Sequence, residues 1–536
     1  MVPEPRPFRA GGGFAFGLLL VVALLWASAI GFHQRGQVNF SSDQAIPALM
    51  ALDIRDHGSH PVFYWGVHYD GSLEPHLLSL AFRLLPDTVR TYRLVMLGLM
   101  TISTILVAIA GARAFGPWAG LLAGGYLAVG PSFLYFKLLS SDGAYTSFFT
   151  LTTAAVLIGV FFVRESAPVR ARALAFSLGL VLGVAWWVTP LSIVLACIPF
   201  AGWIAAPRVW LKVDRLVLAI AGLLLGASPW LAENLRTDFA SLRSSEMGAA
   251  DLHLAATQLR TLVARGLPVL LGGRSPGSRV PTFPASEALS VVVFGALIAA
   301  GIYFSRRRRE PEGRFLALVS TFLLVVPGVL ALSRARTNFR EDPRFLIASY
   351  VGIAVVAGLV AAHLIERGFR RRAIGFGLLV ALLGLVSQFR SPRYGDDPKH
   401  GRIAETEALA RRLSLSGIRH IYAEYWIAYR LSFLSRGWLV ASPFGEGTPG
   451  PIRDIRAYEQ VGASPAPAFL LDATHAARLR GFLDSRSLEY RHEVLPEIER
   501  ELIWEIPAAE LAAIRACACL APAGTRPGKA GPSTES

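Results

Sequence analysis

Long apolar runs recur along most of this chain, and they constrain its fold more than any other feature. About eleven of them approach or reach the roughly 17 to 25 residues that a helix needs to cross a bilayer. A backbone surrounded by lipid must satisfy its own hydrogen bonds, so such runs form helices. The chain is therefore predicted to be a polytopic α-helical membrane protein. The runs lie at residues 14–32, 92–112, 117–136, 144–163, 173–189, 191–206, 216–232, 288–305, 314–332, 345–365 and 373–389.

Basic residues predict the orientation of these spans. The formal net charge is +15, but the excess falls in short clusters between alternate runs, as in Arg306 to Arg309 and Arg370 to Arg372. This is the positive-inside pattern, so we expect a cell-membrane protein with a cytoplasmic N-terminus, and no nucleic-acid partner. The first run is long and lacks a convincing cleavage site, which favours an uncleaved span over a signal peptide.

The loop after the first run is too long to be a simple connector. Apolar residues recur with helical spacing at 44–56 and 73–85, which predicts two amphipathic helices lying in the membrane interface. Pro61, Gly66 and Gly71 mark a turn between them. The charge pattern places this loop on the extracytoplasmic side.

The pattern changes near residue 390. Helices are expected at 404–413 and 475–485, and strands at 416–422 and 468–471. This alternation predicts a small extracytoplasmic α/β domain at 391–520, after a transmembrane domain at 1–390. The last segment, 521–536, is rich in Pro, Gly and Ser and is expected to be a disordered tail.

Two carboxylates stand at predicted outer membrane boundaries. Asp43 follows the first span in SSDQAI, and Asp142 follows the third in SSDGAY. Each residue type also suits a helix N-cap, and this structural interpretation remains open for both. Because topology places them on one face, they are also candidates for acid–base or substrate-orienting work.

A basic loop breaks the charge rule on that same outer face. It reads SRARTNFREDPR, and arginine forks bind phosphate in bidentate fashion. An anionic headgroup or a lipid phosphate is therefore the expected ligand, although pairing with Glu341 and Asp342 is the alternative. The predicted phosphate-binding residues are Arg336, Arg340, Arg344, Arg55 and Lys137.

The remaining titratable residues do not suggest a metal. The histidines of the first outer loop lack the tight spacing of a zinc site, and three cysteines give neither a CxxC motif nor a disulfide framework. No cofactor is expected, and a divalent metal has no support in the sequence.

Several segments together resemble the GT-C membrane glycosyltransferases, specifically the family 39 group of protein O-mannosyltransferase and aminoarabinose-transferase relatives. The resemblance covers about residues 14–390. The segments that carry it are SSDQA, FYWGVHYDGSLEPHLLSLAFRLL, SSDGAY, WWVTPLSIVLACIPF and DPRFLIASY. AEYWIAYRLSF looks like part of the periplasmic tail of some bacterial members.

The resemblance implies a GT-C fold and transfer of a sugar from a polyprenyl-phosphate carrier to an outer-face acceptor, usually with inversion. It implies that Asp43 is the catalytic carboxylate, and it matches Asp142 and Arg344 to further family positions. Gln44 departs from the acidic residue that often follows that aspartate, and Phe345 replaces a commoner tyrosine. The predicted substrate pocket contains Glu74, His76, Tyr64 and Tyr69.

The sequence thus predicts a hexosyl- or pentosyltransferase with Asp43 as general base and a glycan, lipid or protein as acceptor. A transporter or flippase of a lipid-linked or anionic solute is the alternative. Transporters tend to place ionisable residues within spans, whereas most charges here lie at boundaries or in outer loops. A scaffold or sensor is a third interpretation, but the C-terminal region shows no recognisable site.

Overall fold

The computed structural model describes residues 11–37, 40–141, 143–243, 252–276, 278, 280–332, 342–391, 403–444 and 452–516. The chain forms two compact units, each described by itself below. The helical unit contains residues 1–38, 68–74 and 93–392. The mixed unit contains residues 39–67, 75–92 and 393–536.

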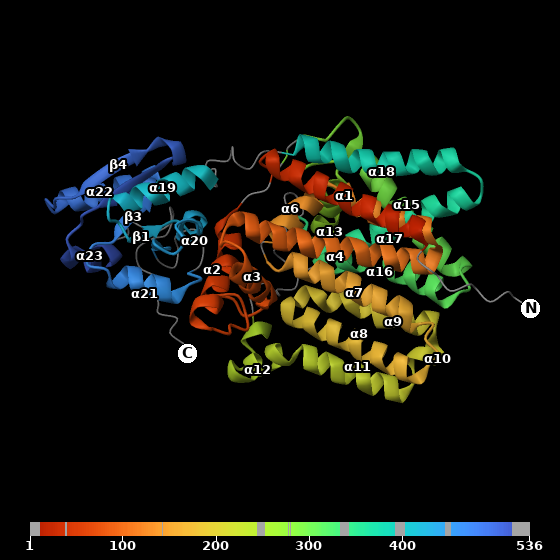
Figure 1. Ribbon diagram of the computed structural model, residues 1–536. Coiled ribbons are helices and arrows are strands. Elements are labelled where there is room, and N and C mark those ends of the chain that lie inside the picture. Colours follow the sequence, from red (N-terminus) through yellow and green to blue (C-terminus); the bar gives the residue numbers. More distant parts are fainter. Residues whose placement is uncertain are drawn as a thin grey trace, which may run out of the picture. The chain divides into compact units, whose positions relative to one another are not determined.

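Eight helices are long and apolar enough to cross a membrane by themselves. Each matches one of the apolar runs of the sequence, and basic residues such as Arg113 and Arg306 lie in their last turns. The eight are α1 (Gly12–Gln34), α4 (Val89–Phe115), α7 (Tyr145–Phe162), α8 (Pro168–Val188), α15 (Ser286–Arg307), α16 (Pro311–Leu332), α17 (Ser349–Glu366) and α18 (Arg370–Arg390) (Figure 1).

The other three predicted runs are helical but broken, so a count of eleven spans is not confirmed. α5 (Pro117–Ala128) and α6 (Ser132–Ser140) meet at 75°, and α11 (Val213–Gly226) and α12 (Ser228–Arg236) meet at 57°. The third run is a 3₁₀ helix, η1 (Pro190–Ala196), followed by the short α9 (Cys197–Ala205). Each break has a proline, which lacks the N–H that a continuous helix requires. The described residues give eight spans, or ten if each bent pair is one span.

Side chains of α18 satisfy the backbone at the break between α5 and α6. The Gln388 amide nitrogen donates to the carbonyl oxygen of Gly130 at 2.6 Å. The Ser132 N–H donates to the hydroxyl oxygen of Ser387 at 2.9 Å. Backbone groups freed by a bend would be costly if buried without partners, so these two bonds stabilise the bend.

Glycines bring α8 and α11 into close contact. A Cβ atom on Gly183 would lie 2.2 Å from the carbonyl oxygen of Leu223, and one on Gly226 would lie 2.3 Å from that of Leu180. Small residues at such crossings let two backbones approach, as is common between membrane helices. Shorter elements of this unit are α10 (Pro207–Trp210), η2 (Ala240–Leu242), α13 (Leu252–Thr261), η4 (Leu262–Gly266), α14 (Leu267–Leu271) and η5 (Arg344–Leu346).

The mixed unit contains a five-stranded sheet in the order β2-β1-β3-β5-β4. β2, β1 and β3 are parallel, whereas β5 is antiparallel to both β3 and β4. Figure 1 labels most of these elements. The strands are β1 (His420–Ala423), β2 (Val440–Ser442), β3 (Ala468–Leu471), β4 (Arg491–Leu495) and β5 (Arg500–Trp504), with η7 (Pro496–Ile498) before β5 and η8 (Ala508–Glu510) after it. The helices are α19 (Ile403–Leu415), α20 (Tyr425–Leu434), α21 (Ile455–Ala463), α22 (Ala473–Ser485) and α23 (Leu511–Ala516).

Alternate residues of the central strands supply two apolar cores. Ile421 and Leu470 belong to one buried cluster, and Tyr422 and Phe469 belong to the other. Because successive strand residues point to opposite faces, both faces of the sheet are covered. The α/β character predicted after residue 390 is therefore confirmed.

Most of the loop between α1 and α4 joins this unit. It folds into α2 (Ser42–His57) and α3 (Leu73–Leu84), close to the two helices predicted there. α20 packs against α2, and the Phe433 ring lies 5.3 Å from that of Phe40 and 6.2 Å from that of Phe82. The predicted domain boundary lies at residue 390. In the structure, α2 and most of α3 belong to the same compact unit as the C-terminal segment.

Candidate active site

Asp43 lies in the first turn of α2 but does not cap that helix. Ser41 is the N-cap, and its side chain forms a capping box with Gln44. The Ser41 N–H donates to the Gln44 side-chain oxygen at 2.7 Å. This pair supplies the reciprocal bonds that a helix start requires, so the capping interpretation of Asp43 is wrong. Gln44, which departs from the family pattern, has a structural role at this position.

A tyrosine of the C-terminal segment holds the Asp43 carboxylate. The Tyr425 hydroxyl, at the start of α20, donates a hydrogen bond to Asp43 Oδ1. Burial, together with the negative charge of Asp43, raises the pKa of Tyr425, so the phenol keeps its proton. Asp43 is half-buried and thus oriented by a neutral donor, an arrangement that suits a carboxylate that accepts a proton.

Among the predicted phosphate ligands that the structure describes, Lys137 is the most deeply buried. Its side chain on α6 is 1% exposed, and its Nζ lies 2.7 Å from Asp342 Oδ2. The rings of Phe136 and Tyr145 lie 5.4 and 5.5 Å from the ammonium group. A buried cation needs an anionic partner, and Asp342 occupies that position here.

The same contact brings the Arg344 segment to Lys137. Asp342 is two residues before Arg344, which begins η5 and is half-buried with its guanidinium 5.6 Å from the Phe345 ring. The alternative sequence interpretation paired Asp342 with arginines of its own loop, but the structure pairs it with a lysine about 200 residues earlier. Arg336 and Arg340 lie outside the described residues.

Glu74 holds the described residues between α6 and α7. The Glu74 side chain is fully buried and accepts hydrogen bonds from the Ser141 hydroxyl and from both the N–H and the hydroxyl of Ser147. Ser141 and Ala144 have φ values of 46° and 59°, a strained region for residues other than glycine. Asp142 itself lies outside the described residues, so its catalytic role stays a prediction.

The other predicted site residues differ in burial and in their contacts. Tyr64 is buried, and Tyr69 and His76 are half-buried; their place in a sugar pocket stays a prediction. Arg55 pairs with Asp56 at 2.6 Å and Asp87 at 3.6 Å. Its Nη1 also donates to the Phe82 carbonyl at 3.3 Å, so Arg55 fastens α2 to α3.

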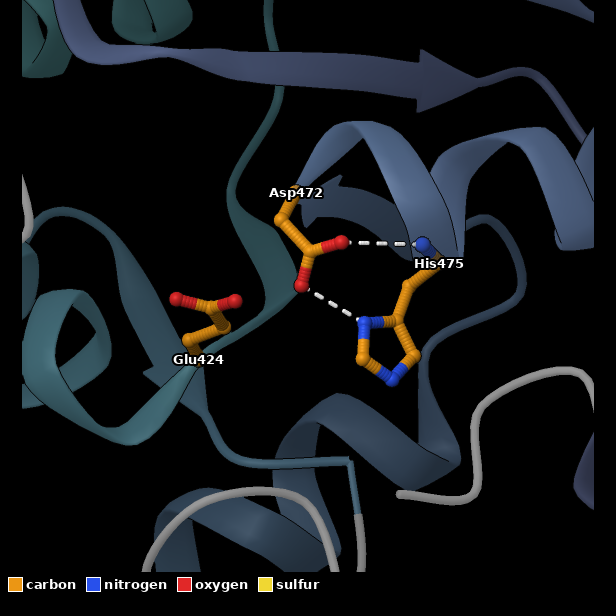
Figure 2. A group of neighbouring side chains, drawn as sticks. All are labelled: Glu424, Asp472 and His475. Carbon is orange, nitrogen blue, oxygen red and sulfur yellow. Dashed lines mark hydrogen bonds and ion pairs between the residues drawn. The ribbon is translucent and has the colours of Figure 1, made fainter. Parts of the chain in front are cut away.

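One further group, shown in Figure 2, has ligand atoms close enough for a metal ion: Glu424, Asp472 and His475. Arg500 pairs with Glu424 at 2.7 Å. Asp472 Oδ1 accepts from the first turn of α22, and Oδ2 lies 2.6 Å from His475 Nδ1. A cation here would have to displace existing bonds. Burial would raise the pKa of Asp472, but hydrogen bonds from Glu424 and His475 lower it to about 2.

The sequence did not reveal the role of Tyr425. It also did not reveal an ion pair on α2, the helix that contains Asp43. Arg456 Nη1 lies 2.9 Å from Asp53 Oδ1 and Nη2 lies 2.8 Å from Oδ2, while its guanidinium lies 5.3 Å from the Trp65 ring. Tyr425 stands in the AEYWIAYRLSF stretch that the resemblance singled out, but its contact with Asp43 joins residues 382 positions apart.

This architecture defines a class, the polytopic membrane proteins with the GT-C fold. No protein-family model matches the sequence, and no curated protein matches it. Solved structures carry the likeness instead. ArnT from Cupriavidus metallidurans bound to undecaprenyl phosphate has a TM-score of 0.60 and 14% identity, covering 94% of this chain and 99% of that one.

Two further solved structures agree. The apo form of the same ArnT gives a TM-score of 0.59 at 13% identity over the same shares. An Archaeoglobus fulgidus oligosaccharyltransferase, in complex with Zn and sulfate, gives 0.51 at 11% identity, covering 84% of this chain and 67% of that one. The predicted GT-C fold is therefore confirmed.

Proposed function

We propose that this protein transfers a sugar from a polyprenyl-phosphate carrier to an acceptor on the extracytoplasmic face of the cell membrane. The observation that carries the proposal is Asp43, a carboxylate free of helix capping and oriented by a buried tyrosine hydroxyl. A fold shared with ArnT over almost the whole of both chains, in a structure that holds undecaprenyl phosphate, supports the same donor class.

On the donor side, cationic groups would stabilise the departing phosphate. Lys137 is buried beside Asp342, and Arg344 begins the next helical turn. A phosphate monoester anion is a good leaving group when positive charge faces it, so no acid is needed to protonate it. The carrier phosphate would compete with Asp342 for the Lys137 ammonium group.

On the acceptor side, Asp43 would act as general base. It would accept the proton of an acceptor hydroxyl or amine while that atom attacks the anomeric carbon from the face opposite the phosphate. This single displacement inverts the anomeric configuration. Tyr425 would keep the carboxylate in one orientation throughout, since its own proton is retained.

The proposal is tested by incubating the purified protein with radiolabelled polyprenyl-phosphate sugars, pentoses and hexoses separately, and with candidate glycan, lipid and peptide acceptors. Label should move to an acceptor with release of polyprenyl phosphate. Lys137→Gln and Arg344→Gln should each raise the KM for the donor, while Arg83→Gln, a substitution of the arginine in the last turn of α3, should not. Movement of intact donor across a vesicle membrane, with no sugar transferred, would instead indicate a transporter.

A further inference from the structure

A second basic site lies in the helical unit, at the turn between α15 and α16. A pocket of about 690 Å³ opens there. Its lining includes four arginines of the RRRREPEGR stretch, and apolar or hydroxyl side chains from the facing turns of the two helices. The lining residues are Ile302, Ser305, Arg306, Arg308, Arg309, Arg314, Leu318, Thr321 and Phe322.

The arginines of this pocket form no ion pair with the acidic residues that the structure describes. Within the described part of the chain, no ion pair involves Arg306, Arg308, Arg309 or Arg314. Arg308 lies 5.4 Å from the ring of Phe115, a cation–π contact that brings no negative charge to the pocket. Four like charges around one hollow repel each other, so an anion that enters it is stabilised.

The nearest buried carboxylate cannot supply that anion. Glu312 is 4% exposed and pairs with Arg164 at 2.9 Å and Arg113 at 3.5 Å, which come from other parts of the unit. Glu310 is exposed and makes no ion pair in the part of the chain that the structure describes. It does not line the pocket. The arginine excess at the pocket is therefore not neutralised by the protein.

The pocket also has an apolar wall. Leu318 and Phe322 on α16 face Ile302 on α15, which is 39% exposed. Gly301 allows the two helices to approach, because a Cβ atom there would lie 2.3 Å from the Thr321 hydroxyl oxygen. A ligand of this site must thus combine the charge of a phosphate with an apolar chain. Both α15 and α16 have the length and composition of membrane spans, and the turn that joins them forms this site.

We propose that this pocket binds an anionic glycerophospholipid, and prefers a headgroup with two phosphates. Basic pockets between membrane helices bind such headgroups because each guanidinium near the phosphate contributes, and the acyl chains follow the apolar crease. The bound lipid would be a structural component of the membrane. The pocket does not include Lys137 or Arg344, and it is formed by different helices.

The test is native mass spectrometry of the detergent-purified protein titrated with cardiolipin, phosphatidylglycerol or phosphatidylcholine. The triple variant R306Q/R309Q/R314Q should weaken cardiolipin binding by about tenfold or more, since each arginine contributes near an anionic headgroup. The matched control R370Q/R371Q/R372Q removes the same charge from the exposed start of α18, outside the pocket, and should leave binding unchanged.

A second variant tests the apolar wall without changing charge. Leu318→Trp should fill the pocket and weaken lipid binding while the four arginines remain. Added inorganic pyrophosphate should compete poorly, because it lacks the acyl chains. Equal losses in the two triple variants, equal binding of phosphatidylcholine, or complete displacement by pyrophosphate would each overturn the proposal.

Discussion

Asp43 and Glu74 are both carboxylates in the first turn of a helix within the first outer loop, and both were predicted to be site residues. Their surroundings differ. Asp43 is half-buried and is held by a tyrosine hydroxyl, while a capping box serves its helix. Glu74 is fully buried and accepts bonds from Ser141 and Ser147. The comparison shows that two carboxylates at the same helical position can have different hydrogen-bond partners, and from these partners we predict a chemical role for Asp43 and a structural role for Glu74.

The largest expected effect tests the part of that comparison that concerns Asp43. Asp43→Asn should reduce transfer about a thousandfold, because general-base catalysis contributes on that order and an amide cannot accept the proton. The melting temperature should stay near that of the wild type. Asp56→Asn, an exposed substitution on the same helix, is the control for activity. Wild-type transfer by Asp43→Asn would remove Asp43 from the mechanism.

Glu74→Ala tests the second half of the comparison, the structural role of Glu74. Buried donors on Ser141 and Ser147 would lose their acceptor, which should destabilise the protein by about 2 kcal/mol or more. Thermal unfolding followed by fluorescence should show a lower midpoint, unlike Asp43→Asn. Glu366→Ala, at the exposed end of α17, is the control. An unchanged midpoint together with a large loss of activity would assign Glu74 to chemistry and end the contrast.

Tyr425→Phe sharpens the comparison by removing only the hydroxyl that orients Asp43. We expect kcat to fall about tenfold, as for the loss of one hydrogen bond to a charged group, with little change in KM. Tyr458→Phe, in the same unit, is the control. A fall in melting temperature that accounts for the lost activity would mean that Tyr425 has only a structural role.

A third carboxylate, Asp53 on α2, extends the comparison to pH. Burial would raise the pKa of Asp53, but the hydrogen bonds and the charge of Arg456 lower it below the ordinary 3.8. Asp53 therefore contributes stability above that value, and the contribution is lost as the pH falls through the lowered pKa. Unfolding midpoints measured between pH 6 and pH 2 should fall less steeply in Arg456→Gln, and Arg486→Gln should retain the wild-type slope.

The smallest expected effect concerns metal. We expect transfer to be unaffected by dialysis against a chelator, because no predicted step uses a metal ion. The carboxylates at Glu424 and Asp472 are engaged by Arg500, by α22 and by His475. Loss of activity on chelation, and recovery on adding one divalent metal, would contradict this and would direct attention to that group.

Much of the fold could be predicted because its signals are local. Eight of the apolar runs are single helices and the other three are broken helices, and the strand predicted at 468–471 is β3. The number of straight spans could not be predicted, because a proline shows where a helix breaks but not the angle at which the chain continues. The short η1–α9 segment and the two bent pairs are the result.

The site could be predicted only in part, because sequence signals are local and several of its contacts join distant residues. Ser41 and Gln44 form a capping-box signature that was visible in the sequence and would have freed Asp43 from the capping interpretation. The partners of Asp43 and Lys137 come from positions 425 and 342, and no periodicity links residues so far apart. Such pairs follow from tertiary packing alone.

The bend between α5 and α6 has a consequence for how the protein tolerates change. Lys137 follows that bend by two turns, and the bend depends on Ser387 and Gln388 near the end of α18. Those two polar side chains bond to Ser132 and Gly130 at the bend, and in this way they help to set the direction of the helix that carries Lys137. Substitutions at Ser387 or Gln388, near the end of α18, would therefore be expected to change the surroundings of Lys137, although they lie about 250 residues away in the sequence.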